Sequence, residues 1–128
     1  MTDTRDRDLL ADMALRKQID VRFADSCNEA HALAHQLKAP VVLCDRDSQA
    51  GEWRELVKTL AAIRQRPSVV LASQVVDEYL WREVIRNGGY DVLAKPLRED
   101  DVLRSVRLAW LYWHSAQKRY EISPLRTA

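Results

Sequence analysis

The sequence predicts an α/β fold in which a mainly parallel sheet lies between two layers of helices. Three short apolar runs, Val41–Cys44, Val69–Ala72 and Val92–Ala94, are continuous rather than alternating, which is typical of strands covered on both faces. Helical patterns separate the runs, and this alternation implies parallel strands with right-handed crossovers. Each run also ends in a polar residue, at the edge where open α/β sheets bind ligands.

Three elements are expected before the first run. An amphipathic pattern from about Asp6 to Lys17 predicts a helix. Ile19–Phe23 alternates strictly, as a half-exposed strand near a sheet edge does. Ser26 and Glu29 have the spacing of a capping box, so a second helix starts there and stops before Pro40. The residues expected to face inward are Leu9, Leu10, Met13 and Ala14 in the first helix and Ala30, Leu33, Ala34 and Leu37 in the second.

The remaining elements follow the same alternation. After a loop at Ser48–Gly51, a helix runs to about Arg66, where Pro67 breaks it. Another helix spans about Asp77 to Arg86, and Asn87-Gly88-Gly89 predicts that it ends with a residue in the left-handed conformation. The last helix begins with acids at Glu99 and finishes near Lys118 and Arg119. The expected inward residues are Trp53, Leu56, Val57, Leu60 and Ile63 in the first of these helices and Val102 or Leu103, Val106, Trp110 and Trp113 in the last.

The composition limits the class of protein. The 128 residues suit one domain, with a core over about residues 6–115 and a tail over about 120–128. A net charge of +1 gives no field that favours nucleic acid or an anionic membrane. No signal peptide or membrane span is apparent, so a cytoplasmic protein is expected. Cys27 and Cys44 fit neither a disulfide framework nor a metal motif, and Cys44 is expected to be a buried thiol.

A carboxylate, a hydroxyl and an amine stand at the ends of the three runs. Asp45 follows the first run, Ser73 the second, and Lys95 the third, just before Pro96. Because the carboxyl ends of parallel strands share one edge of a sheet, the three side chains are expected to lie together. Each residue alone has an ordinary explanation, as a strand end, a turn residue or a solvated lysine. Only the three together favour a chemical site.

With this order of elements and these strand ends, the chain resembles the receiver domain of bacterial two-component response regulators, which has the CheY-like, flavodoxin-like fold. The resemblance covers about residues 6–115. It rests on Val41–Asp45, on Ser73 and on the segment Gly88–Pro96. Ser73 and Lys95 are 22 positions apart, the usual separation of the hydroxyl and lysine of this family.

The resemblance implies a phosphoryl-accepting site. Asp45 would accept the phosphoryl group from a sensor histidine kinase or a phosphotransfer protein, and Ser73 and Lys95 would contact its oxygens. Mg²⁺ would be the cofactor, bound by Asp45 and by the backbone carbonyl of Asp47, with Asp3 the nearest match for a further acid. Phosphoryl transfer depends mainly on positioning and on neutralising charge, which suits these groups. The Lys95–Pro96 bond is often cis in the family.

The chain departs from the family pattern at its start. Receivers open with an apolar strand that ends in an acidic pair, whereas here the first residues are polar, and Asp3, Asp6 and Asp8 follow no apolar run. Either the assigned first residue lies downstream of the true start of the protein, so that this strand is missing, or the sheet has four strands with Ile19–Phe23 beside Val41–Cys44. An unpaired edge would invite another chain.

Two smaller departures concern signalling output. The loop after Asp45 lacks the usual proline and reaches Gly51 early. Val92 stands where most receivers have an aromatic switch residue, and Tyr90 has the parity to point elsewhere in its strand. The aromatic switch is therefore expected to be absent or different.

Three functions follow, and none of them is an enzyme with turnover, because no nucleophile–base pair is evident. The first is a stand-alone receiver phosphorylated on Asp45. The second is a degenerate receiver that binds partners without phosphorylation. The third is a small-molecule binder, which has little support because the sequence lacks a Gly-rich phosphate loop.

The remaining candidate residues are histidines and exposed aromatics. His31 and His35 lie four residues apart with no third metal ligand, and His114 has no evident partner. Leu111 and Tyr112 form either an exposed patch that favours a partner surface or part of a helix packed on both sides. For an exposed patch, the resemblance to receivers implies a homodimer through the last two helices.

Overall fold

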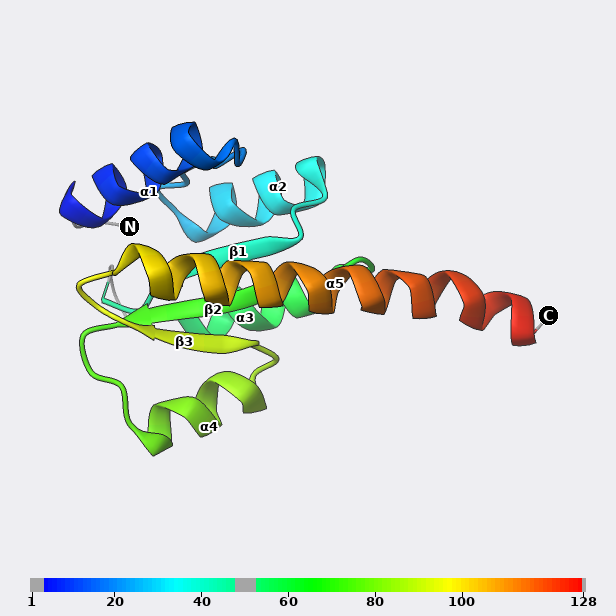
Figure 1. The fold of residues 1–128 in the computed structure, drawn as a ribbon. Helices are drawn as coiled ribbons and strands as arrows, with labels where there is room; N and C mark the ends of the chain where they lie inside the picture. Colours follow the sequence, from blue (N-terminus) through cyan, green and yellow to red (C-terminus); the bar gives the residue numbers. More distant parts are fainter. Residues whose placement is uncertain (1–3, 48–52, 128) are drawn as a thin grey trace.

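The computed structural model describes residues 4–47 and 53–127 and has three layers (Figure 1). The middle layer is a parallel sheet of three strands in the order β1–β2–β3, which are β1 (Val41–Asp45), β2 (Ser68–Ser73) and β3 (Asp91–Ala94). One face is covered by α1 (Thr4–Lys17) and α5 (Glu99–Thr127), the other by α2 (Cys27–Leu37), α3 (Trp53–Ala61) and α4 (Glu78–Arg86). The predicted α/β fold with a parallel sheet is confirmed. None of the described helices is long and apolar enough to cross a membrane.

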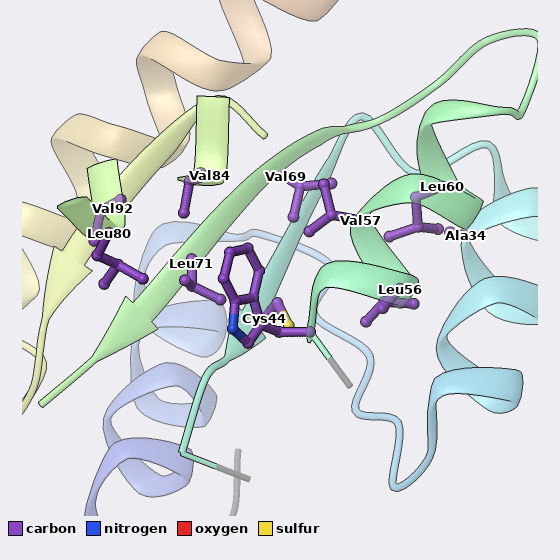
Figure 2. Close-up of a cluster of buried hydrophobic side chains, with 11 residues drawn as sticks. Ala34, Cys44, Leu56, Val57, Leu60, Val69, Leu71, Leu80, Val84 and Val92 are labelled. Atoms are coloured by element: carbon purple, nitrogen blue, oxygen red, sulfur yellow. The ribbon is translucent and has the colours of Figure 1, made fainter. Parts of the chain in front are cut away.

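β2 is the centre of the protein because both of its neighbours are strands and both of its faces are covered. All six of its residues are buried. Val69 and Leu71 point into the core under α2, α3 and α4, which Figure 2 shows. Val70 and Ala72 point into the core under α1 and α5. The continuous apolar run therefore has the origin that the sequence predicts, namely burial on two sides.

The strand register brings three strand ends to one edge of the sheet. Asp45 at the end of β1 is paired with Ala72 of β2, and Ser73 is paired with Ala94 of β3. Backbone bonds continue past the strands: Arg46 N donates to Ala72 O at 2.9 Å, and Lys95 N donates to Ser73 O at 2.9 Å. This carboxyl edge is called the rim below.

Local sequence signals explain the ends of two helices. The hydroxyl of Ser26 accepts from Glu29 N at 3.1 Å and caps α2, and Asp77 accepts from Leu80 N at 2.8 Å and caps α4. Gly88 follows α4 with φ of 101°, as the glycine pair predicts.

The prediction of a strand at Ile19–Phe23 is wrong, because residues 19–24 form neither helix nor strand. The sheet therefore has three strands, not four, in the described part of the chain. The alternation does reflect the environment, because Phe23 packs on the core under α1 and α5. Asp20 and Arg22 are exposed and pair with each other at 2.9 Å. An alternating pattern reports one buried side, but a strand also needs a hydrogen-bonded neighbour.

The inward face of α5 also differs from the prediction. Trp110 is 43% exposed, whereas Val102, Ser105 and Ala109 are buried. The hydroxyl of Ser68 donates to Ala109 O at 3.0 Å, so α5 lies close to β2. Only small side chains fit there, and the tryptophan is displaced to the surface.

Three smaller predictions about the helices are wrong. Leu37 is 44% exposed, because α2 ends directly after it at Lys38, which is left-handed with φ of 52°. α3 ends at Ala61, earlier than predicted, and turns carry the chain onward, although Ile63 still packs on the core. α5 continues to Thr127, beyond the predicted end near Lys118 and Arg119. The loop predicted at Ser48–Gly51 lies outside the described residues.

Candidate functional site

The rim holds a buried ion pair between two of the predicted site residues. Lys95 Nζ lies 2.8 Å from Asp45 Oδ1. The side chains are only 5% and 1% exposed, respectively. Asp45 belongs to β1, and Lys95 follows β3 directly, before the cis peptide bond to Pro96. The two residues are 50 positions apart in the sequence, and the central strand between them fixes their separation.

Asp47 supports the same ion pair from the loop that follows β1. Its backbone N donates to Asp45 Oδ1 at 2.9 Å, so this oxygen accepts from both Asp47 N and Lys95 Nζ. Its own carboxylate accepts from Gln74 N at 2.9 Å and lies 3.5 Å from Lys95 Nζ. The side chain of Asp47 therefore ties the loop after β1 to the loop after β2, a role that sequence reasoning did not assign.

The protonation of Lys95 follows from these contacts. Burial acts to lower the pKa of Lys95, but the hydrogen bond to Asp45 and the negative charges of Asp45 and Asp47 outweigh it. The pKa of Lys95 is therefore raised above its usual value. The rim carries a fixed ammonium at neutral pH, which suits the neutralisation of an anion.

Ser73 lies at the neighbouring strand end, and its hydroxyl is already engaged. It is fully buried, donates to Val75 O at 2.7 Å and accepts from Val75 N at 3.1 Å. A further donor is Arg46, whose guanidinium NH1 lies 3.3 Å from Ser73 Oγ. The structure thus places the three strand-end side chains along one edge, with Ser73 linked to the residue after Asp45.

Two residues at or near the rim were not predicted to act there. Arg46 could have been found from its position, since it directly follows Asp45. Asp6 of α1 is fully buried, and its Oδ1 accepts from Leu97 N at 3.1 Å. Its Oδ2 is buried without a hydrogen-bond partner among the described residues. No local pattern identifies Asp6, because its partner lies 91 positions away.

The described residues do not fit the acid set expected for Mg²⁺. Asp45 and Asp47 are at the rim, but Asp6, an acid near the start of the chain, is turned towards Leu97 N. No group of three or more His, Cys, Asp or Glu side chains suited to a metal is found within residues 4–47 and 53–127. Asp3, the residue expected to supply a further acid, lies outside the described residues. No step is therefore assigned to magnesium.

The other candidate residues lie in ordinary surroundings. His31 and His35 stack at 6.4 Å, and His114 stacks on Trp110 at 5.1 Å. Burial raises the pKa of the Cys44 thiol to about 12, so Cys44 is a protonated core residue, as expected. A cavity of about 420 Å³ lies between α2 and α3, and its lining includes Cys27, His31 and Glu55 but none of the rim residues.

The position of the aromatic switch is filled by an aliphatic core residue. Val92 is 8% exposed and packs under α2, α3 and α4. Tyr90 packs on the opposite core and contacts Tyr112 of α5, with the rings 5.2 Å apart. Tyr90 thus couples the start of β3 to α5 rather than to the rim.

Comparison with known proteins identifies the fold. No family model matches the chain, and no curated protein matches it in sequence. Among solved structures, a CheY-like response regulator receiver domain protein from Methanospirillum hungatei JF-1 has a TM-score of 0.76 and 16% identity, covering 89% of this chain and 91% of that one. A response regulator from Thermotoga maritima has a TM-score of 0.69 and 25% identity, covering 81% and 88%.

A third neighbour carries a different description. A structure described as an adenylate cyclase from Rhodopirellula baltica has a TM-score of 0.77 and 18% identity, covering 94% of this chain and 92% of that one. The chain has the CheY-like receiver fold, so the resemblance predicted from the sequence is confirmed.

Proposed function

We propose that this chain is the receiver module of a two-component phosphorelay. Asp45 accepts a phosphoryl group from a sensor histidine kinase or a phosphotransfer protein, and the module signals through protein–protein contacts. Response regulators among the structural neighbours support the signalling class. The module itself performs no turnover.

The observation that carries this proposal is the buried contact of Lys95 Nζ with Asp45 Oδ1 at 2.8 Å. In the transfer, a carboxylate oxygen of Asp45 attacks phosphorus, the bond from phosphorus to the donor breaks, and the donor leaves with that electron pair. The equatorial oxygens carry the negative charge in this step. The ammonium of Lys95 would then pair with a phosphoryl oxygen, with Ser73 beside it.

Intact mass spectrometry tests the proposal directly. The full chain is incubated with acetyl phosphate in buffer containing magnesium, and we expect one phosphoryl adduct. Asp45→Ala removes the attacking oxygen and should abolish the adduct. Asp8→Ala is the matched control, because Asp8 is an exposed aspartate of α1, and it should react like the unchanged chain. An adduct that persists in Asp45→Ala would contradict the proposal.

An interaction module that works without phosphorylation is the second candidate. It is favoured by the acids at the rim, because residues 4–47 and 53–127 contain no group of three or more metal-binding side chains that could hold the magnesium expected for phosphorylation. The same experiment separates the two candidates. A folded chain that gives no adduct would support the second function and exclude the first.

We further propose that the module forms a homodimer through α4 and α5. Both helices expose large apolar side chains, a feature of interaction surfaces. They are Tyr79, Trp81 and Ile85 on α4 and Leu108, Trp110, Leu111 and Tyr112 on α5.

Sedimentation of Trp110→Ser against Leu15→Ser tests the dimer. Leu15 is the matched control, since it is 83% exposed on α1. Loss of a central aromatic at an interface costs about 2 kcal/mol or more, so Trp110→Ser should weaken dimerisation by more than about tenfold. Equal behaviour of the two variants, or a monomeric unchanged chain, would exclude this surface.

A further inference from the structure

The described residues place side chains of both charges at the rim. They include two carboxylates, of Asp45 and Asp47, and two cations, of Lys95 and Arg46. The ammonium of Lys95 contacts both acids. The guanidinium of Arg46 lies on the side of Ser73, at the neighbouring strand end. Cations therefore flank the Asp45 position from the β3 end and from the β2 end.

Arg46 is held in place at both its backbone and its side chain. Its backbone N donates to Ala72 O at 2.9 Å, which extends the pairing of β1 with β2 by one residue. Its NH1 donates to Ser73 Oγ at 3.3 Å in a half-buried environment. A guanidinium carries five donors in a planar fork that matches phosphate geometry. Ser73 takes one of these donors, and the fork lies beside the hydroxyl that is proposed to contact a phosphoryl oxygen.

The acids that would hold a divalent cation are not assembled by the described residues. The Asp6 carboxylate accepts a hydrogen bond from Leu97 N, on the face of the sheet that α1 covers. Additional positive charge at the rim comes instead from Arg46. A phosphoryl group on Asp45 would add negative charge next to two fixed cations.

We propose that Arg46, with Lys95, binds the oxygens of the phosphoryl group on Asp45 and takes over the charge neutralisation that a divalent cation would supply. This inference rests on the proposed phosphorylation of Asp45. With acetyl phosphate, an oxygen of the Asp45 carboxylate attacks phosphorus, the bond between phosphorus and the acetyl oxygen breaks, and acetate leaves with the electron pair. Arg46 and Lys95 form charge-assisted hydrogen bonds to the oxygens during this step.

The test compares the rate of adduct formation in EDTA and in magnesium for three chains. The unchanged chain should form the adduct at similar rates in both buffers. Arg46→Gln should be slower by about a hundredfold or more in EDTA, the scale for losing one donor to developing charge. Arg46→Lys should recover part of the rate, because it restores the charge without the planar fork. Arg66→Gln is the matched control: Arg66 is exposed and precedes β2, at the opposite edge of the sheet, and it should not change the rate.

The outcomes separate this inference from the proposed function. An adduct that forms only with magnesium, at the same rate in Arg46→Gln, would overturn the role of Arg46 while keeping Asp45 as the acceptor. No adduct in either buffer would overturn both. Circular dichroism and thermal unfolding of each variant identify any loss that comes from misfolding. If Arg46→Gln unfolds, the EDTA and magnesium rates of the unchanged chain and of Arg46→Lys decide: strict magnesium dependence overturns the inference, and independence supports it.

Discussion

The rim and the outer side of β1 are two margins of the same sheet, and they are ordered in different ways. At the rim, polar contacts join the strand ends: Lys95 pairs with Asp45, and Arg46 donates to Ser73. Along the outer side of β1, residues 41–43 are only half-buried, and the preceding segment 19–24 forms no strand. The rim is closed by specific polar contacts, whereas the outer margin is covered by helices and an irregular segment.

Three paired strands are therefore enough to assemble the polar contacts of the rim, although β1 has no strand on its outer side in the described part of the chain. The rim depends on the register of β1, β2 and β3, which continuous apolar runs secure. Backbone pairing along the outer side of β1 would need another strand there, and none is present in the described part of the chain. Three experiments test how firmly the centre of the sheet, its margins and the rim are held.

The largest effect is expected from truncating the central strand. Leu71→Ala removes a fully buried side chain of β2 and should lower the free energy of unfolding by about 2–5 kcal/mol. Leu43→Ala makes the same change in β1, where Leu43 is half-buried, and should cost clearly less because less packing is lost. Urea denaturation measures both. Equal losses would mean that the outer margin of β1 is packed as tightly as the centre.

An intermediate effect is expected at the contact between α1 and the segment after β3. Asp6→Ala leaves Leu97 N buried without its acceptor, which should lower the free energy of unfolding by about 1–3 kcal/mol. Asp6→Asn retains an oxygen acceptor and should cost less. Asp8→Ala, an exposed change on the same helix, should be nearly neutral. If Asp6→Ala is also neutral, α1 is not held to the rest of the protein through this contact.

The smallest effect is expected from pH. The pKa of Lys95 is raised because its contacts with Asp45 and Asp47 outweigh burial. Its ion pair therefore stabilises the fold fully below the unfolded lysine pKa of about 10.4, and this stabilisation is lost as the pH rises through the higher folded pKa. The stability difference between the unchanged chain and Lys95→Met should shrink when denaturation is repeated at increasingly alkaline pH. A difference that stays constant across that range would show that Lys95 does not stabilise the fold through its charge.

The sequence predicts the sheet better than its surroundings. Continuous apolar runs identify β1, β2 and β3, because burial on both faces leaves no polar positions in them. The residues at the ends of these runs, Asp45 and Lys95, are placed at the rim because parallel strands have their carboxyl ends at the same edge of the sheet. The 2.8 Å contact between Lys95 Nζ and Asp45 Oδ1 depends on side-chain positions that the sequence pattern does not specify.

The errors have a common physical cause: each depends on a neighbour that the local pattern does not specify. Ile19–Phe23 alternates as a strand would, but no partner forms a ladder with it. Trp110 lies on a plausible inward stripe, yet the close approach of α5 to β2 leaves room only for Ala109. Asp6 and Arg46 acquire their contacts from residues 91 and 27 positions away.

The seating of α5 on β2 has a mechanical consequence. The helix is anchored through its first half, at Val102, Ser105 and Ala109, and its second half projects past the sheet to Thr127 (Figure 1). At a rise of about 1.5 Å per residue, the helix continues for roughly 27 Å from Ala109 to Thr127. A tilt of about 5° at the contact between Ser68 and Ala109 would therefore move the far end of the helix by about 2 Å.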